Sequence, residues 1–386
     1  MREAVVVAYG RAPVTRSRKG GLAFTHPVEY GAQVLKGVLA KVPQIKPEDI
    51  GDVIVGCAMP EGPMGYNMGR VIVKRAGLPD CVTAQTINRF CSSGLQAIAT
   101  AANAIMAGQE DIMVAGGCET MTMVPMGSNT KESDLDPWML KHNPEAYMPM
   151  GLTAENVAAK YGVTRLEMEQ MAVESNAKAA AAIENGEFDS QIIPIETVDG
   201  EGNPVVVKMD DGVRKGTNLE GLAALKPCFK PDGVVTAATS SQTSDGCGFV
   251  VLMSKEKAEE MGIKPIAKFV GFALGGVPAE LMGIGPIEAV PKVLKKTGLK
   301  IEDMDVIELN EAFAAQAIPV IKITGMDKAK VNPNGGALAL GHPLGATGAN
   351  LTCKALAYLE KHGGKYAMVT MCIGGGMGAA GIYEML

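Results

Sequence analysis

The sequence predicts an α/β protein with two similar halves and an inserted segment between them. Apolar strands alternate with Ala-rich helical stretches in the first 118 residues, and this alternation returns from about residue 264. Stretches of the first region have counterparts in the second, which indicates an internal repeat. The chain has 386 residues, 47% of them hydrophobic, which is enough to bury two or three cores.

The first half opens with the apolar strand EAVVVA, which is followed by a helix around residues 30–41 and by a second strand, DVIVGC. The stretch VTAQTIN predicts another strand directly before Cys91. Apolar residues then recur at helical spacing over residues 95–106, among many small side chains, and the strand DIMVAGG follows. We expect this helix to be buried on most sides.

The second half repeats this order of elements. IGDVIVGCAM resembles MDVIELNEAF, and CSSGLQAIATAANAIMAG with the strand DIMVAGG resembles HPLGATGANLTCKALAYLEKHG with the strand YAMVTMC. The alignment gives Cys91 and His342 equivalent positions, each at a strand-to-helix turn. Two copies that face each other would bring both turns to one site.

The composition changes between the halves. This segment contains one clear helix around residues 163–185 and a locally basic stretch with Arg214, Lys215, Lys226 and Lys230. A ligand that carries phosphates could dock on these cations, but an ordinary solvated loop has the same pattern. We expect an N-terminal half of residues 1–119 and 245–263, an inserted loop domain of residues 120–244, and a C-terminal half of residues 264–386.

Charge and composition exclude several classes of function. The net charge of −6 argues against a nucleic-acid-binding protein, because such proteins carry a basic face. No stretch approaches the roughly 18 consecutive apolar residues of a membrane span, and MREAVVVAYGRAP suits an opening strand better than a secretory signal. None of the eight cysteines forms a Cys-x-x-Cys pair, which argues against a zinc site. We therefore expect a cytoplasmic protein without a metal site.

Cys91 has the setting of a nucleophile. It follows a predicted strand and opens a helix, where unpaired backbone N–H groups and the helix dipole can stabilise a thiolate. The small residues Ser92, Ser93 and Gly94 would let a carbonyl group approach the sulfur. A buried structural cysteine would also fit this context.

Three further residues stand in glycine-rich or strand-end settings. His342 lies in GGALALGHPLGATGAN, where it is either a hydrogen-bonded core histidine or a catalytic base. Cys372 ends the strand AMVTMC and runs into IGGGMGAAG, whose glycines could expose N–H groups to an oxyanion. This glycine run lacks the Lys-Ser/Thr of a phosphate loop and the acidic partner of a dinucleotide fold. Asn310 follows another strand and could hold a water by its amide.

The motifs NRFCSSGLQAI, NEAFAAQ, GGALALGHPLGATGA and MCIGGGMG resemble the thiolase family in order and spacing across essentially the whole chain. The resemblance implies a five-layered α-β-α-β-α core of two halves with an inserted loop domain, assembled as a homodimer or homotetramer. It implies that Cys91 is the acyl-accepting nucleophile, His342 its activating base and Cys372 the acid/base. Asn310 would position a water that forms one oxyanion hole with His342, and the N–H groups of Cys91 and Gly374 would form the other.

The resemblance also implies a binding site for coenzyme A, which takes part as co-substrate. Arg214 would lie beside its adenine end and Ser241 beside its pantetheine, while the tunnel would be lined by Met150, Phe229 and Phe313. The family's reaction breaks or forms a carbon–carbon bond of 3-oxoacyl-CoA through an acyl-cysteine. It implies ping-pong kinetics, no permanent cofactor or metal, and a possible partner enzyme of fatty-acid β-oxidation.

Within the family, PMGLTAENVA, SSQTSDG and GGVPAELMGIGP resemble the degradative 3-ketoacyl-CoA thiolases more than the acetoacetyl-specific type, which usually has His-Met-Gly where this chain has Pro149-Met150-Gly151. The chain departs from the pattern at Ala237–Thr239, Cys247–Phe249 and Asn350, which puts the chain-length preference in doubt. Two alternatives remain. A ketoacyl synthase would be expected to have histidines in place of Cys372, and a non-catalytic acyl-CoA-binding relative commonly loses part of the cysteine and histidine set.

Overall fold

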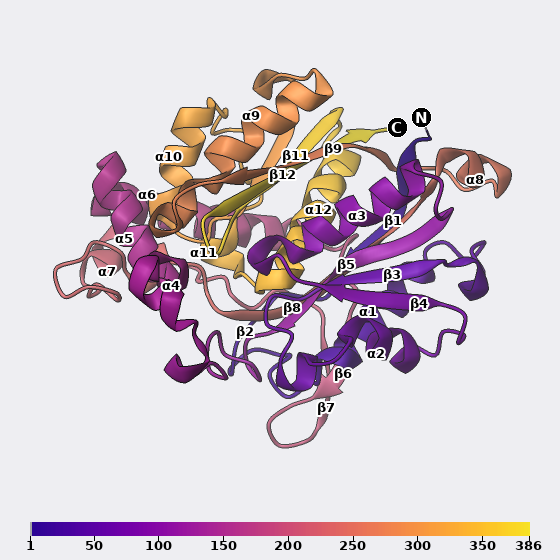
Figure 1. The fold of residues 1–386 in the computed structure, drawn as a ribbon, viewed down its shortest axis with the longest axis horizontal. Helices are drawn as coiled ribbons and strands as arrows, with labels where there is room; N and C mark the ends of the chain where they lie inside the picture. The colour runs from indigo at the N-terminus through magenta and orange to yellow at the C-terminus, as the bar shows by residue number, and fades with distance from the viewer. Residues whose placement is uncertain (1) are drawn as a thin grey trace.

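The computed structural model describes residues 2–386 and contains one ten-stranded mixed sheet in the order β10-β11-β12-β9-β1-β8-β5-β3-β4, with β2 paired to β8 (Figure 1). The strands of the first half are β1 (Ala4–Arg11), β2 (Thr15–Arg16), β3 (Asp52–Gly56), β4 (Thr83–Ile87), β5 (Ile112–Thr120) and β8 (Ser244–Ser254). Those of the second half are β9 (Ala267–Gly276), β10 (Val306–Leu309), β11 (Tyr366–Ile373) and β12 (Met377–Met385).

The predicted repeat is visible in the strand pairing. In the first half β3 pairs in parallel with β4 and β5, and in the second half β10 pairs in parallel with β11. The counterpart of β4 is reduced to one parallel bridge between Ile307 and Val331. The left-handed backbone of Asn332 (φ 44°) and Gly335 (φ 75°) turns the chain away directly after that bridge.

The two half-sheets meet at a narrow seam, because β1 pairs with β9 only at Val5–Lys268 and Val6–Ala267. Helices α3 (Ser93–Met106) and α12 (Leu344–His362) lie between the half-sheets, and their side chains share one core with strands from both. Helices α1 (Pro27–Leu39) and α2 (Met68–Arg75) cover the outer face of the first half, and α9 (Gly285–Thr297) and α10 (Ala314–Thr324) that of the second. The predicted five layers, α-β-α-β-α, are confirmed.

The two central helices approach each other through glycines at their N-termini. A Cβ added at Gly94 would lie 2.8 Å from the carbonyl oxygen of Gly345, and one at Gly348 would collide with the backbone of Leu95. Gly94 and Gly345 each lie three residues after the equivalent residues Cys91 and His342. This backbone contact therefore brings the two turns of the repeat together.

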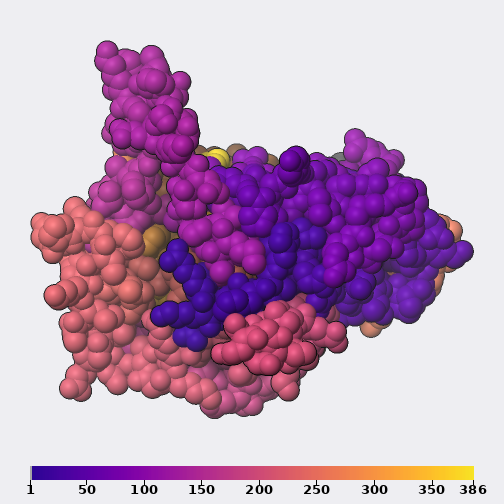
Figure 2. All heavy atoms as spheres, turned by 90° about the horizontal axis from the view of Figure 1, so that it is seen from below, coloured from indigo at the N-terminus to yellow at the C-terminus, as the bar shows by residue number. Residues whose placement is uncertain are grey.

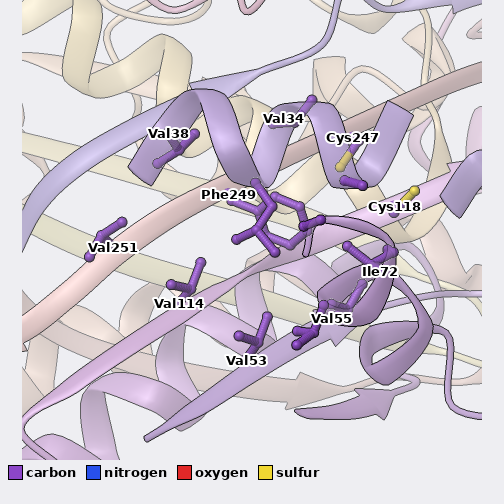
Figure 3. Close-up of a cluster of buried hydrophobic side chains, with 14 of the residues drawn as sticks. Val34, Val38, Val53, Val55, Ile72, Val114, Cys118, Cys247, Phe249 and Val251 are labelled. Carbon is purple, nitrogen blue, oxygen red and sulfur yellow. The ribbon is translucent and has the colours of Figure 1, made fainter. Parts of the chain in front are cut away.

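The outer core of the first half shows why its strands form where they do. Figure 3 shows Phe249 of β8 at the centre of a cluster with valines from β3, β5 and α1. Branched side chains such as Val53, Val55 and Val114 suit the pleated sheet, since they pack against neighbours on one face. Phe249 is fully buried there and fixes the register of β8 in the cluster.

The chain leaves the sheet after β5 and returns to it at β8, where Thr120 lies opposite Asp245. The intervening segment contains α4 (Pro137–His142), α5 (Met150–Tyr161), α6 (Arg165–Glu184), β6 (Ile195–Val198), β7 (Pro204–Val207) and α7 (Leu219–Ala223). Figure 2 shows a purple-magenta lobe, the colour of the stretch that carries α4, standing out from the body. Two further short helices are α8 (Lys255–Glu260) and α11 (Ala337–Leu340). Within residues 2–386, no helix is long and apolar enough to cross a membrane.

Candidate active site

Cys91 lies in a 3-10 turn, Phe90–Ser92, directly before α3, and not in the helix itself. Phe90 has a left-handed backbone (φ 43°), which places the sharp bend one residue before the sulfur. Its N–H donates to Asn88 Oδ1 at 2.7 Å, and its carbonyl accepts the Ser93 hydroxyl at 2.6 Å. Side chains on both sides of the bend thus hold the strained residue and fix the orientation of Cys91.

The Cys91 thiol is buried among Ala58, Met121 and Leu344. Burial raises its pKa to about 11, while hydrogen bonds from the N–H groups of Gly374 and of Cys91 itself act in the opposite direction. Stabilisation of the thiolate by backbone N–H groups is therefore present but smaller than the desolvation cost. The free thiol is protonated at neutral pH and needs a base to become a nucleophile.

His342 can serve as that base. Its ring is buried, and Nδ1 lies 2.6 Å from Thr347 Oγ1 while Nε2 lies 3.4 Å from the Asn310 amide nitrogen. An arrangement with Nδ1–H donating to Thr347 and Nε2 accepting from Asn310 satisfies both contacts. Burial lowers the pKa of His342 to about 4, so the imidazole is neutral and Nε2 can accept a proton.

The turn that carries His342 differs from the sequence prediction in one respect. The residue follows the short helix α11 and not a strand, because the strand equivalent to β4 ends at Val331. The backbone N–H of His342 lies 3.1 Å from the carbonyl of Gln242 and 3.2 Å from Ser244 Oγ. The start of β8, which belongs to the first half, therefore holds the histidine turn of the second half.

Cys372 lies near the end of β11, fully buried beside Met282 and Ala312. Burial and, next, the proximity of the Cys91 sulfur raise the pKa of Cys372. Met150 packs against the clusters of both cysteines, although the two residues come from different halves of the chain. Gly374 opens the turn to β12, in which Gly375 and Gly376 have φ of 78° and 85°. The backbone N–H of Gly374 lowers the pKa of Cys91.

Asn310 follows β10 and is completely buried. Its backbone N–H donates to Thr370 of β11 at 3.0 Å, and its amide oxygen Oδ1 has no hydrogen-bond partner among the described residues. The next residue, Glu311, accepts from Ser175, Asn332 and the N–H of Leu338. This carboxylate joins the Asn310 turn to the chain that leads into His342.

The residues expected to contact coenzyme A fall into two groups. Phe229 and Phe313 meet edge to face with ring centroids 6.0 Å apart, Met150 packs against the clusters of both cysteines, and Ser241 donates its N–H to Ala312 at 2.9 Å. These four lie together beside the site. Arg214 lies apart from them on an exposed loop, where its backbone N–H donates to Asn176.

Of the basic residues in the inserted segment, Lys215 pairs with Glu184 at 2.8 Å. Arg214, Lys226 and Lys230 have no ion pair among the described residues. Three of the four cations are thus available to a phosphate-bearing ligand, and the fourth is engaged in a surface pair of small energetic value.

Sequence reasoning missed three residues that the fold brings to the site: Thr347, Met282 and Glu119. Thr347 lies five residues after His342. Had the residues after His342 been treated as the start of a helix, Thr347 could have been predicted to lie near the ring. Met282 and Glu119 come from other elements and carry no local signal. Their roles depend on packing alone.

The raised pKa of Cys91 predicts how its alkylation depends on pH. Between about pH 7 and 9 the rate with iodoacetamide should rise about tenfold per unit, because the thiolate fraction of a group with pKa about 11 rises in that proportion. Peptide mass mapping separates Cys91 from the exposed Cys81 and Cys228. A plateau for Cys91 below pH 9 would contradict the desolvation argument.

Comparison with known proteins places this geometry in a family. Residues 4–256 match the family model described as "Thiolase, N-terminal domain", and residues 263–385 match the model described as "Thiolase, C-terminal domain". The chain is 48% identical to a 3-ketoacyl-CoA thiolase of Bacillus subtilis, with all of both chains covered, and 43% identical to an acetyl-CoA acetyltransferase of Chromobacterium violaceum, with 98% of each covered. The crystal structure of the Bacillus anthracis acetyl-CoA acetyltransferase superposes with a TM-score of 0.92 at 38% identity, covering 100% of this chain and 99% of that one. The chain belongs to the thiolase family.

Proposed function

We propose that the protein is a 3-ketoacyl-CoA thiolase, which cleaves 3-oxoacyl-CoA with coenzyme A to acetyl-CoA and a shortened acyl-CoA, and catalyses the reverse condensation. The observation that carries the proposal is the pair of buried thiols, Cys91 and Cys372, which both have Met150 packed against their clusters. The His342 turn meets the Cys91 turn through Leu344, which packs in the Cys91 cluster, and through the close approach of Gly94 and Gly345. One thiol can hold an acyl group while the other moves a proton to or from carbon.

In the first half-reaction, Nε2 of His342 accepts the Cys91 proton as the sulfur attacks the 3-oxo carbon. The N–H groups of Cys91 and Gly374, which both lower the pKa of the Cys91 thiol, would stabilise the alkoxide that forms beside the sulfur. The bond between C2 and C3 then breaks, and its electron pair stays on C2 as the enolate of acetyl-CoA. Nε2–H of His342, with a water held by the free amide oxygen of Asn310, would stabilise the enolate oxygen.

Cys372 completes this half-reaction when it gives its proton to C2, which releases acetyl-CoA. The Cys372 thiolate then takes the proton of the coenzyme A thiol, and the resulting thiolate attacks the acyl group on Cys91. The Cys91 sulfur leaves and recovers its proton from His342, which regenerates the starting enzyme. Coenzyme A enters as a co-substrate, and no permanently bound group takes part.

The unpaired cations and the aromatic pair support the proposed binding mode. Arg214 would attract the adenine end with its phosphates, and Ser241, Met150, Phe229 and Phe313 would enclose the pantetheine arm. Met59, Met121 and Met150 pack around Cys91. Flexible thioethers adapt to acyl chains of different length, which favours the broad-range subtype.

Cleavage assays test the proposal and its subtype together. Purified protein with coenzyme A should cleave both acetoacetyl-CoA and 3-oxohexadecanoyl-CoA. Cleavage of acetoacetyl-CoA alone would mean the short-chain acetyl-CoA acetyltransferase, a name that one relative carries. Cleavage of neither would contradict the thiolase activity and leave a synthase-like or binding role.

We further propose a cytoplasmic homodimer or homotetramer, composed of an N-terminal half, the inserted loop domain and a C-terminal half. The eight unpaired cysteines support a reducing compartment. Among the described residues strand β4 pairs with β3 alone and ends the sheet path, so its outer edge is open to a strand of a second copy. The 3-oxo substrate requires an enzyme that oxidises 3-hydroxyacyl-CoA, which would be the metabolic partner.

A further inference from the structure

The most unusual buried group outside the described chemistry is the carboxylate of Glu119, near the end of β5. It is completely buried and takes part in no ion pair among the described residues. One oxygen accepts the N–H groups of Ala58 at 2.7 Å and Gly345 at 2.8 Å, and the other accepts that of Met59 at 3.1 Å. A buried carboxylate without a cation is costly, so three such bonds are needed to offset its desolvation.

One of these bonds reaches the histidine turn. Gly345 lies in the first turn of α12, three residues after His342 and two before Thr347, whose hydroxyl contacts the ring. A Cβ at Gly345 would lie 2.6 Å from the Glu119 oxygen, so the backbone there approaches the carboxylate as closely as only glycine permits.

The bond to Ala58 leads to the cysteine turn. Glu119 holds the N–H of Ala58, and the carbonyl of Ala58 accepts the side-chain amide of Asn88 at 3.0 Å. The oxygen of that same amide accepts the N–H of Phe90 at 2.7 Å, and Phe90 is the strained residue directly before Cys91. A continuous chain of hydrogen bonds therefore runs from one carboxylate to both catalytic turns.

We propose that Glu119 is a positioning residue that fixes the Cys91 turn relative to the His342 turn. The inference deepens the proposed thiolase function and rests on it. Glu119 acts through the backbone of Ala58 and Gly345 and does not touch substrate.

The protonation state of Glu119 gives the proposal a distinct signature. Burial raises its pKa to about 7, although the N–H groups of Ala58, Gly345 and Met59 oppose this shift. The titratable groups around Glu119 are the thiols of Cys57, Cys91 and Cys118 and the hydroxyl of Tyr30. The Tyr30 hydroxyl donates to the backbone carbonyl of Glu119. Below that pKa the Glu119 carboxylate is protonated, and one of its oxygens becomes a hydrogen-bond donor. This oxygen can no longer accept hydrogen bonds from the backbone N–H groups that face it. Activity should therefore fall as pH decreases through about 7.

The test compares wild type with Glu119→Gln, which keeps the size but does not titrate. We expect kcat for acetoacetyl-CoA cleavage at pH 8 to fall about 10- to 100-fold, with KM for coenzyme A changed less than about threefold, since positioning acts on the chemical step. The fall in activity below about pH 7, here called the acidic limb, should be absent from the Glu119→Gln variant. Asp305→Asn is the matched control, because Asp305 also accepts two backbone N–H groups, at Lys365 and Tyr366, at the opposite end of β11.

A second variant tests the link without touching the buried carboxylate. Asn88→Ala, at an exposed position, should lower the rate of Cys91 acylation by acetyl-CoA, measured as the mass increase of one acetyl group, and keep the acidic limb. This acylation assay does not require carbon–carbon cleavage, so it separates failure of the positioning role from failure of the proposed function. The proposal would be overturned if Glu119→Gln kept the acidic limb, or if its kcat fell no more than that of Asp305→Asn. Acylation of Asn88→Ala at the wild-type rate would also overturn it.

Discussion

Cys91→Ala is expected to abolish cleavage of 3-oxoacyl-CoA, with a loss on the order of 10⁴-fold or more, because the variant has no atom that can accept the acyl group. Removal of one small sulfur from a buried site should cost only about 1 kcal/mol of stability, so the variant remains folded. Steady-state cleavage of acetoacetyl-CoA and the mass of the acylated protein measure the two effects.

The matched control for this variant is Cys81→Ala, which removes an exposed cysteine outside the site. It should retain wild-type cleavage and acylation. Residual cleavage in Cys91→Ala within about 100-fold of wild type, or an acyl group found on another residue, would contradict the assignment of Cys91 as nucleophile.

Cys372→Ala should separate acyl transfer from proton transfer to carbon. The variant keeps Cys91, His342 and the N–H of Gly374, so acetyl-CoA should still acylate Cys91. Cleavage and condensation should each fall about 10³-fold, since no other acid is placed to protonate the enolate carbon. Exchange of the α-protons of acetyl-CoA with deuterium oxide, followed by NMR, should be lost in parallel.

Cys353→Ala provides the control for burial, because Cys353 is a fully buried cysteine of α12 in the central core. It should keep both acylation and proton exchange. Proton exchange at the wild-type rate in Cys372→Ala would remove Cys372 from the mechanism and require another base near C2.

The sequence by itself determined the architecture. Alternating strands and helices, the apolar residues at helical spacing over residues 95–106 and the similarity of the two halves led to an α/β protein with an internal repeat, because burial periodicity and strand propensity are local properties of the chain. The resemblance to the thiolase family implied the five layers. The motifs around Cys91, Asn310, His342 and Cys372 identified the chemical groups. Their settings after strands or at turns were readable because small and glycine residues mark such turns.

The tertiary structure alone decided how these groups behave. The sequence suggested a stabilised thiolate at Cys91, yet desolvation by Ala58, Met121 and Leu344 leaves the thiol protonated. The contacts of His342 with Thr347 and Asn310 also appear only in the folded chain. So does the link from Glu119 to Gly345, across 226 positions of sequence. Desolvation sums over every neighbour in space, and a hydrogen bond needs two groups within about 3 Å, so neither can be read from residues that are adjacent only along the chain.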